Sequence, residues 1–229
     1  MKKQKFSTRV LAEVAIFAAL AFALDALQGG IWRGVFFNGG SIGLAMVPIF
    51  LIGYRRGLLP GVLCGLIVSL VQMLGGIYVI NAGTKWGPLS FLRPFVQVML
   101  DYVLAYTVVG LCGAFSGLYA SSEKRSHKIL WMVVGCTVAG LLKYACHVVA
   151  GGEFWLPDSI EDTAGFWYHS VNWDYSFVYN GTYCIPNIII CTAIMVVLVR
   201  FYPQFIEVSD KKIVKEDVEV VEDETVKEE

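Results

Sequence analysis

Long apolar runs alternate with short polar segments along most of this chain. A bilayer core about 30 Å thick needs roughly 20 helical residues to cross it. Segments of about that length recur along the chain, at residues 8–28, 36–54, 58–77, 93–119, 129–151 and 177–201. The pattern therefore predicts an all-α integral membrane protein with six transmembrane helices.

The second of these segments has the weakest pattern. Its strongly apolar part, SIGLAMVPIFLIGY, is short and contains Pro48, which is expected to kink a helix. The sequence YRRGLLPG that follows predicts a tight turn into the third helix.

Composition supports a membrane protein. Hydrophobic residues make up 56% of the 229 and charged residues only 16%, against about one quarter charged in soluble domains. All six cysteines fall in apolar segments without a CxxC pair. This placement predicts buried thiols rather than disulfides or a zinc site.

Positive charge predicts that both termini are cytoplasmic. With the N-terminus inside, the outer segments hold Arg33, Lys85 and Arg93, and Lys143 lies within a span. The inner segments hold Lys2, Lys3, Lys5, Arg9, Arg55, Arg56, Lys124, Arg125, Lys128, Arg200, Lys211, Lys212, Lys215 and Lys227.

The two ends of the chain carry further signals. The basic N-terminus before an apolar run resembles a signal peptide, with ALAFA as an alternative cleavage site, but the run of about 20 residues favours a retained helix. Residues 204–229 are rich in charge and poor in aromatics. We expect a membrane domain over residues 1–203 and an acidic, disordered cytoplasmic tail after it.

Three polar residues on three predicted helices lie toward the outer side. Asp101 stands about eight residues into the fourth helix, or roughly 12 Å deep at 1.5 Å per residue. His147 is near the outer end of the fifth helix and Asn180 near that of the sixth. Ionisable groups within a membrane are costly and are commonly functional, so these residues predict a binding site.

Aromatic residues accompany this polar layer. Tyr102, Trp155 and Tyr175 are close to it in sequence, and Trp32, Trp86, Trp167 and Trp173 also fall in or beside outer loops. Aromatic walls with a few polar anchors are typical of a small-molecule pocket. A carboxylate among aromatic rings favours a planar cation, through cation–π attraction and counter-charge.

Structural interpretations of the same residues stay open. Asp101 could form an ion pair with Lys143, which shares a helix face with His147. His147 could serve helix packing, and Asn180 could hydrogen-bond between helices. Asp101 and His147 could instead form the acid–base pair of an intramembrane enzyme, although no nucleophile or metal set accompanies them.

The first helix carries small residues at four-residue spacing. Ala15 and Ala19, with Ala12 and Ala23 on either side, form a stripe that allows another helix to approach closely. The stripe fits either packing within the bundle or docking to a separate membrane protein.

The sequence contains no GxxxxGK[ST] phosphate loop and no HExxH. Active transport would therefore draw its energy from a partner or from an ion gradient.

Together these motifs resemble the thiamine-specific S-components of energy-coupling factor (ECF) transporters. The matching elements are AIFAALA in the first helix, GGSIGLAMVPIFLIGYRRG, QVMLDYVLAY, KYACHVVAGGEFW and YSFVYNGTY. They follow the family's order and cover most of residues 10–200. The resemblance implies a substrate-binding subunit in the bacterial plasma membrane, with no catalytic residue, cofactor, metal or nucleic-acid partner.

The resemblance also assigns roles to residues. Asp101 matches the family's acidic residue, which is expected to complement the charge of thiamine. Ala15 and Ala19 match the motif that contacts a transmembrane coupling protein, which carries two ATPase subunits, and Trp32 resembles part of a lid over the pocket. The family's remaining pocket positions fall on Tyr102, His147, Trp155, Tyr175 and Asn180.

The chain departs from the family pattern in three places. The neighbourhood of Cys64 lacks an aromatic residue, and the loops at residues 78–92 and 156–174 look longer than usual. These differences leave room for a thiamine precursor, or for another vitamin, as the ligand.

Overall fold

The computed structural model describes residues 7–32, 35–36, 40–77, 87–154 and 166–207. All regular secondary structure in these ranges is helical. Four helices are long and apolar enough to cross a membrane, Thr8–Ile31, Arg93–Ser121, Arg125–Phe154 and Trp173–Phe201, and Leu58–Met73 is a shorter apolar helix. The all-α membrane fold is thus confirmed, and the number of spans stays a prediction.

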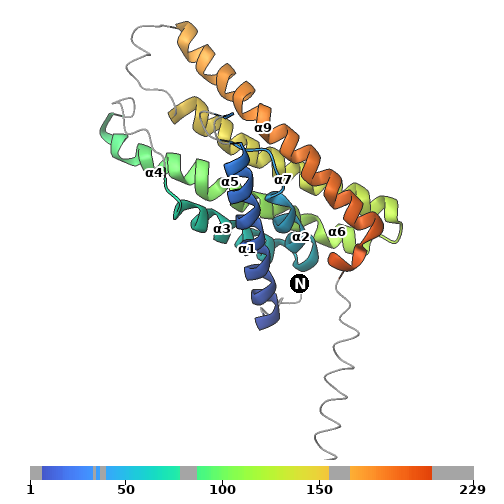
Figure 1. Ribbon diagram of the computed structural model, residues 1–229. Coiled ribbons are helices and arrows are strands. Elements are labelled where there is room, and N and C mark those ends of the chain that lie inside the picture. Colours follow the sequence, from blue (N-terminus) through green and yellow to red (C-terminus); the bar gives the residue numbers. More distant parts are fainter. Residues whose placement is uncertain (1–6, 33–34, 37–39, 78–86, 155–165, 208–229) are drawn as a thin grey trace, which may run out of the picture.

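Helix α1 (Thr8–Ile31) is the first of the long helices and crosses the others at an angle (Figure 1). The Ser7 hydroxyl caps its N-terminus by accepting a hydrogen bond from the Val10 amide at 3.3 Å. Val14, Ala18 and Ala21 are buried at the three- and four-residue spacing of one helix face. This face packs against α2 and α3, so the opposite face of α1 is exposed.

Helix α2 (Met46–Arg56) corrects the prediction for the second segment. It has 11 residues, and the preceding residues 40–45 are not helical, so a helix over residues 36–54 is wrong. Pro48 lies in the first turn, where its missing N–H has no intrahelical acceptor, and does not kink a longer helix. Residues 46–54 are all buried, which places α2 at the centre of the bundle.

Gly57 alone separates α2 from α3 (Leu58–Met73), which confirms the predicted tight turn. Helix α3 then packs closely against the second long helix, Arg93–Ser121. A Cβ atom on Gly110 would lie 2.2 Å from the carbonyl carbon of Gly61. The two backbones can therefore meet only because both positions are glycine.

The second long helix, Arg93–Ser121, is continuous but irregular. It follows a 3₁₀ turn, η1 (Gly87–Leu92), and consists of α4 (Arg93–Val98), the π-helical η2 (Met99–Leu104), α5 (Ala105–Thr107), the 3₁₀-helical η3 (Val108–Phe115) and α6 (Ser116–Ser121). The π-helical stretch contains Asp101. Such stretches are rare and occur frequently at functional sites.

Helices α7 (Arg125–Phe154) and α9 (Phe166–Phe201) form a long antiparallel pair (Figure 1). A short 3₁₀ turn, η4 (Pro203–Phe205), follows α9, and the side chain of Ile206 is buried. The rest of the predicted tail, residues 208–229, lies outside the described residues.

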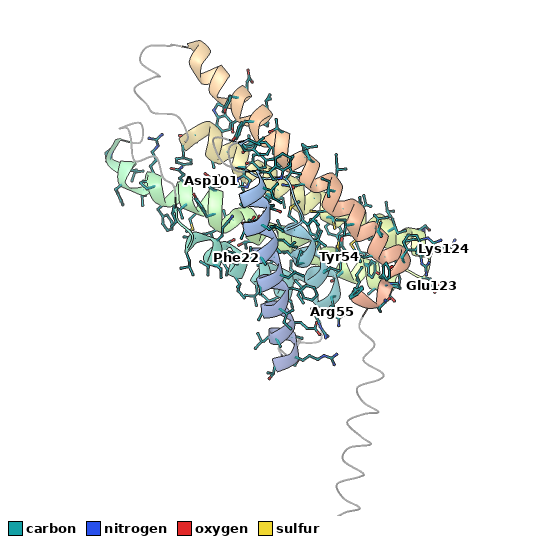
Figure 2. All side chains as sticks on the ribbon, viewed as in Figure 1. Phe22, Tyr54, Arg55, Asp101, Glu123 and Lys124 are labelled. Atoms are coloured by element: carbon teal, nitrogen blue, oxygen red, sulfur yellow. The ribbon has the colours of Figure 1, made fainter. Side chains whose placement is uncertain are left out.

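We call the end of the bundle that holds Glu13, Arg55 and Glu207 the basal end. At this end Arg55 Nε lies 3.0 Å from Glu13 Oε2, and Arg55 Nη1 donates to the Phe205 carbonyl at 3.2 Å. Lys128 Nζ lies 2.6 Å from Glu207 Oε1. We call the opposite part of the bundle, with Asp101, the distal half; Figure 2 shows Asp101 and Arg55 well apart.

Candidate ligand-binding site

The structure brings Asp101 and His147 together in the distal half. Asp101 Oδ1 on η2 lies 3.2 Å from His147 Nδ1 on α7, and their side chains are 11% and 15% exposed. Both residues were predicted for the site. Their contact joins the π-helical stretch of the helix Arg93–Ser121 to α7.

Lys143 approaches the other side of the same imidazole. Its ammonium lies 3.1 Å from His147 Nε2 and 3.8 Å from the centre of the Tyr106 ring. An ammonium group only donates hydrogen bonds, so Nε2 accepts and Nδ1 carries the hydrogen donated to Asp101. His147 is then a neutral bridge between Asp101 and Lys143.

This bridge replaces the direct ion pair considered for Asp101 and Lys143. None of the ion pairs between described residues includes Lys143. Lys143 is nonetheless buried, with 7% of its surface exposed. Its charge is therefore balanced through intervening side chains rather than by direct contact.

Asn180 joins α9 to the same group. Its amide nitrogen donates to the His147 carbonyl at 3.2 Å and to the Ser176 carbonyl on α9 at 2.8 Å. Its amide oxygen accepts a hydrogen bond from the Tyr183 hydroxyl. Asn180 thus makes the predicted interhelical hydrogen bond, and its contact with a ligand stays a prediction.

Aromatic rings extend the polar group toward one side. Tyr175, Tyr179 and Tyr183 follow each other at four-residue spacing on α9, with ring centres 5.4 Å and 6.1 Å apart. Phe36 contacts Tyr183 at 5.6 Å and Trp32 at 5.6 Å between ring centres. We call these five rings the aromatic wall, which includes the predicted Tyr175 and Trp32.

The aromatic wall reaches the imidazole at one ring. The centre of the Tyr183 ring lies 6.0 Å from that of His147, in an edge-on arrangement. The predicted Tyr102 neighbours Asp101 on η2 and is half-buried. The predicted Trp155 lies outside the described residues.

Two buried amides hold residues 40–45 beside the wall. Asn187 Nδ2 donates to the Ser41 carbonyl at 2.7 Å, and Asn187 Oδ1 accepts from the Gly43 amide at 2.6 Å. Gln28 Oε1 accepts from the Ala45 amide at 3.3 Å. The backbone of residues 40–45 is not helical, so these side chains supply the hydrogen bonds that a helix would otherwise provide.

A second carboxylate, Asp25 on α1, escaped the sequence analysis. Its Oδ1 accepts hydrogen bonds from the Tyr106 hydroxyl and from Gln28 Nε2 at 3.2 Å, and its Oδ2 accepts from Gln72 Nε2 at 2.8 Å. The same signal that selected Asp101, an acid within an apolar run, was available for Asp25.

The stripe on α1 faces away from the bundle. Ala15 and Ala19 are exposed, whereas Val14 and Ala18 beside them are buried. Packing of these alanines within the bundle is therefore wrong for this chain, and docking to another protein stays a prediction. Among the described residues, no group of three or more His, Cys, Asp or Glu side chains could hold a metal ion.

Similarity to known proteins covers most of the chain. The profile of the thiamine transporter protein family, Thia_YuaJ, matches residues 11–207. The thiamine transporter ThiT of Bacillus subtilis is 33% identical over 217 residues, which cover 92% of this chain and 100% of that protein. ThiT of Lacticaseibacillus paracasei is 26% identical over 206 residues, covering 89% and 92%.

A solved structure of ThiT from Listeria monocytogenes shares the fold. Its TM-score is 0.60 at 25% sequence identity, and the match covers 87% of this chain and 97% of that one. The range matched by the family profile contains every candidate site residue.

Proposed function

This chain belongs to the thiamine transporter family, and we propose that it is the thiamine-binding S-component of an ECF importer. Family membership makes it a membrane transport protein rather than an enzyme. In our proposal it captures thiamine with high affinity in the distal half. It sits in the bacterial plasma membrane with both termini in the cytoplasm and the distal half toward the outside.

One observation carries the choice of ligand: a carboxylate and an aromatic wall meet around a neutral imidazole. Thiamine has a cationic thiazolium ring and a second flat ring. Asp101 supplies the counter-charge, and the tyrosines of the wall supply cation–π attraction and stacking. His147, as a neutral Nδ1–H donor, orients Asp101 without cancelling its charge.

A titration of the purified protein tests this proposal. Thiamine should quench tryptophan fluorescence at micromolar concentration or below, and mass spectrometry should find thiamine in protein purified from thiamine-fed cells. Absence of quenching, or another vitamin in the purified protein, would refute thiamine as the ligand. A thiamine precursor in its place would keep the family but change the substrate.

The energy for transport comes, in our proposal, from a separate coupling protein that carries two ATPase subunits. The chain itself has no Walker-type phosphate loop. Ala15 and Ala19 present small side chains on the exposed face of α1, where a partner helix can approach closely. We infer that this stripe docks onto the coupling protein.

Ala19→Trp separates docking from binding. The bulky ring should abolish thiamine uptake in cells that express the coupling module, while the purified variant binds thiamine as before. Ile189→Trp is a matched control, because Ile189 is 62% exposed on α9, away from the stripe. Normal uptake with Ala19→Trp would remove the stripe from the docking site.

A further inference from the structure

Lys143 stands between two carboxylates and reaches each through one other side chain. On one side His147 links it to Asp101, through contacts of 3.1 Å and 3.2 Å. On the other side the Tyr106 ring lies 3.8 Å below the ammonium, and the Tyr106 hydroxyl donates to Asp25. The five side chains form one continuous series from η2 to α1.

Asp25 accepts hydrogen bonds from three uncharged side chains. The Tyr106 hydroxyl and the amides of Gln28 and Gln72 all donate hydrogen bonds to it. Hydrogen bonds to the charged form of a carboxylate stabilise that form. None of these donors carries a charge, so the negative charge of Asp25 remains available to a nearby cation.

The formal charges of these five side chains sum to one negative charge. Asp25 and Asp101 contribute one negative charge each, Lys143 contributes one positive charge, and His147 and Tyr106 are neutral. A ligand with a single positive charge would make the whole group neutral. Charge balance of this kind matters most in the low-dielectric interior of a membrane protein.

We propose that Asp25 is a positioning residue for ligand binding: it is the counter-charge of Lys143 and so leaves Asp101 to the cationic ligand. This inference rests on the proposed function, because it presumes that the ligand carries a positive charge. Asp25 acts through Tyr106 and Lys143 and does not touch the ligand.

A double-mutant cycle between Asp25 and Lys143 tests the pairing. Asp25→Asn leaves Lys143 with Asp101 as its remaining counter-charge, so the dissociation constant for thiamine should rise roughly tenfold. In the K143M background the same substitution should change the constant by less than about twofold, because the charge that Asp25 balances is gone. Tyr106→Phe, which keeps the ring but removes the hydroxyl, should act in the same direction with a smaller effect.

Glu13→Gln is the matched control for a lost carboxylate on α1. Glu13 lies on the same helix but pairs with Arg55 and Arg56 at the basal end. Its loss should leave the dissociation constant for thiamine unchanged. A tenfold loss with Glu13→Gln would show that any disturbance of α1 weakens binding, and would overturn the specific role of Asp25.

A second readout needs no ligand. In the unliganded protein, D25N and K143M should each lower the unfolding temperature, and the double variant should lose clearly less than the sum of the two. Additive losses would overturn the pairing, even if the wild type proved to bind no thiamine. If the wild type binds thiamine and D25N weakens binding equally with and without K143M, the pairing is overturned while the proposed function stands.

Discussion

Helix α1 carries two acidic residues whose surroundings differ sharply. Glu13, at the basal end, lies 3.6 Å from Arg9, 3.0 Å from Arg55 and 2.6 Å from Arg56. Asp25, three turns further along, accepts hydrogen bonds from the neutral side chains of Gln28, Gln72 and Tyr106. One helix thus contacts cations directly at one end and neutral donors at the other.

The difference separates a structural charge from a functional one. At the basal end the acid is neutralised where it stands, so its contribution is to hold α1 against the turn between α2 and α3. In the distal half the charges of Asp25, Lys143 and Asp101 are spread through an aromatic ring and an imidazole. An incoming cation can neutralise the net negative charge of these three residues, whereas the charge of Glu13 is already neutralised by arginines.

Asp101→Asn should have the largest effect on affinity. Loss of a buried charge-assisted contact costs about 1.5–3 kcal/mol, so the dissociation constant for thiamine should rise about 10- to 100-fold. Isothermal titration calorimetry measures the change. The exposed Asp174, on α9, is the control, and Asp174→Asn should bind like the wild type. Unchanged affinity with Asp101→Asn would show that Asp101 does not face the cation.

Tyr179→Ala should have an intermediate effect. It removes the central ring of the tyrosine series on α9, and an aromatic contact to a cation is worth about 0.5–2 kcal/mol, or roughly 2- to 30-fold in the dissociation constant. Tyr179→Phe keeps the ring and should bind within about twofold of the wild type. An equally large loss of affinity with Tyr179→Phe would assign the effect to the hydroxyl group instead of the aromatic ring.

Glu13→Gln should change stability and not affinity. Two arginines would lose their counter-charge in a site where the Glu13 side chain is 16% exposed. We expect a loss of about 1–3 kcal/mol in the free energy of unfolding, between the values for surface and buried pairs. Unfolding followed by circular dichroism would measure it. Weaker thiamine binding without a loss of stability would contradict the division between the two ends.

The sequence allowed much of the distal half to be predicted. Counting residues along apolar runs placed Asp101, His147 and Asn180 in the outer half of the bundle, and the structure joins His147 to both of the others. This works because depth in a regular helix follows from the 1.5 Å rise per residue. The hydrogen-bond partner of each polar side chain, however, depends on how the helices are rotated about their axes. A single apolar segment of the sequence does not show this rotation.

The helix predicted over residues 36–54 failed for a related reason. Hydropathy reports how apolar a segment is but not its backbone conformation, and residues 40–45 are held in a non-helical conformation by Gln28 and Asn187. Gly40, with φ +112° and the Tyr183 ring against its α-carbon, adopts a backbone geometry that favours glycine. Two polar side chains from distant helices thus decide the local structure.

The partners of Asp25 and the π-helical stretch could not be predicted from single apolar runs. The role of Asp25 emerges only when Tyr106 and Lys143, from two other helices, are placed beside it. The π-helical residues 99–104 have an ordinary apolar sequence apart from Asp101.

The charge preference of the wild-type site tests the central claim most directly. Calorimetry would compare thiamine with an analogue in which an uncharged thiophene ring replaces the thiazolium. If Asp101 supplies the counter-charge of the cationic ligand, the neutral analogue should bind at least about tenfold more weakly. Equal affinities for the two compounds would contradict the account.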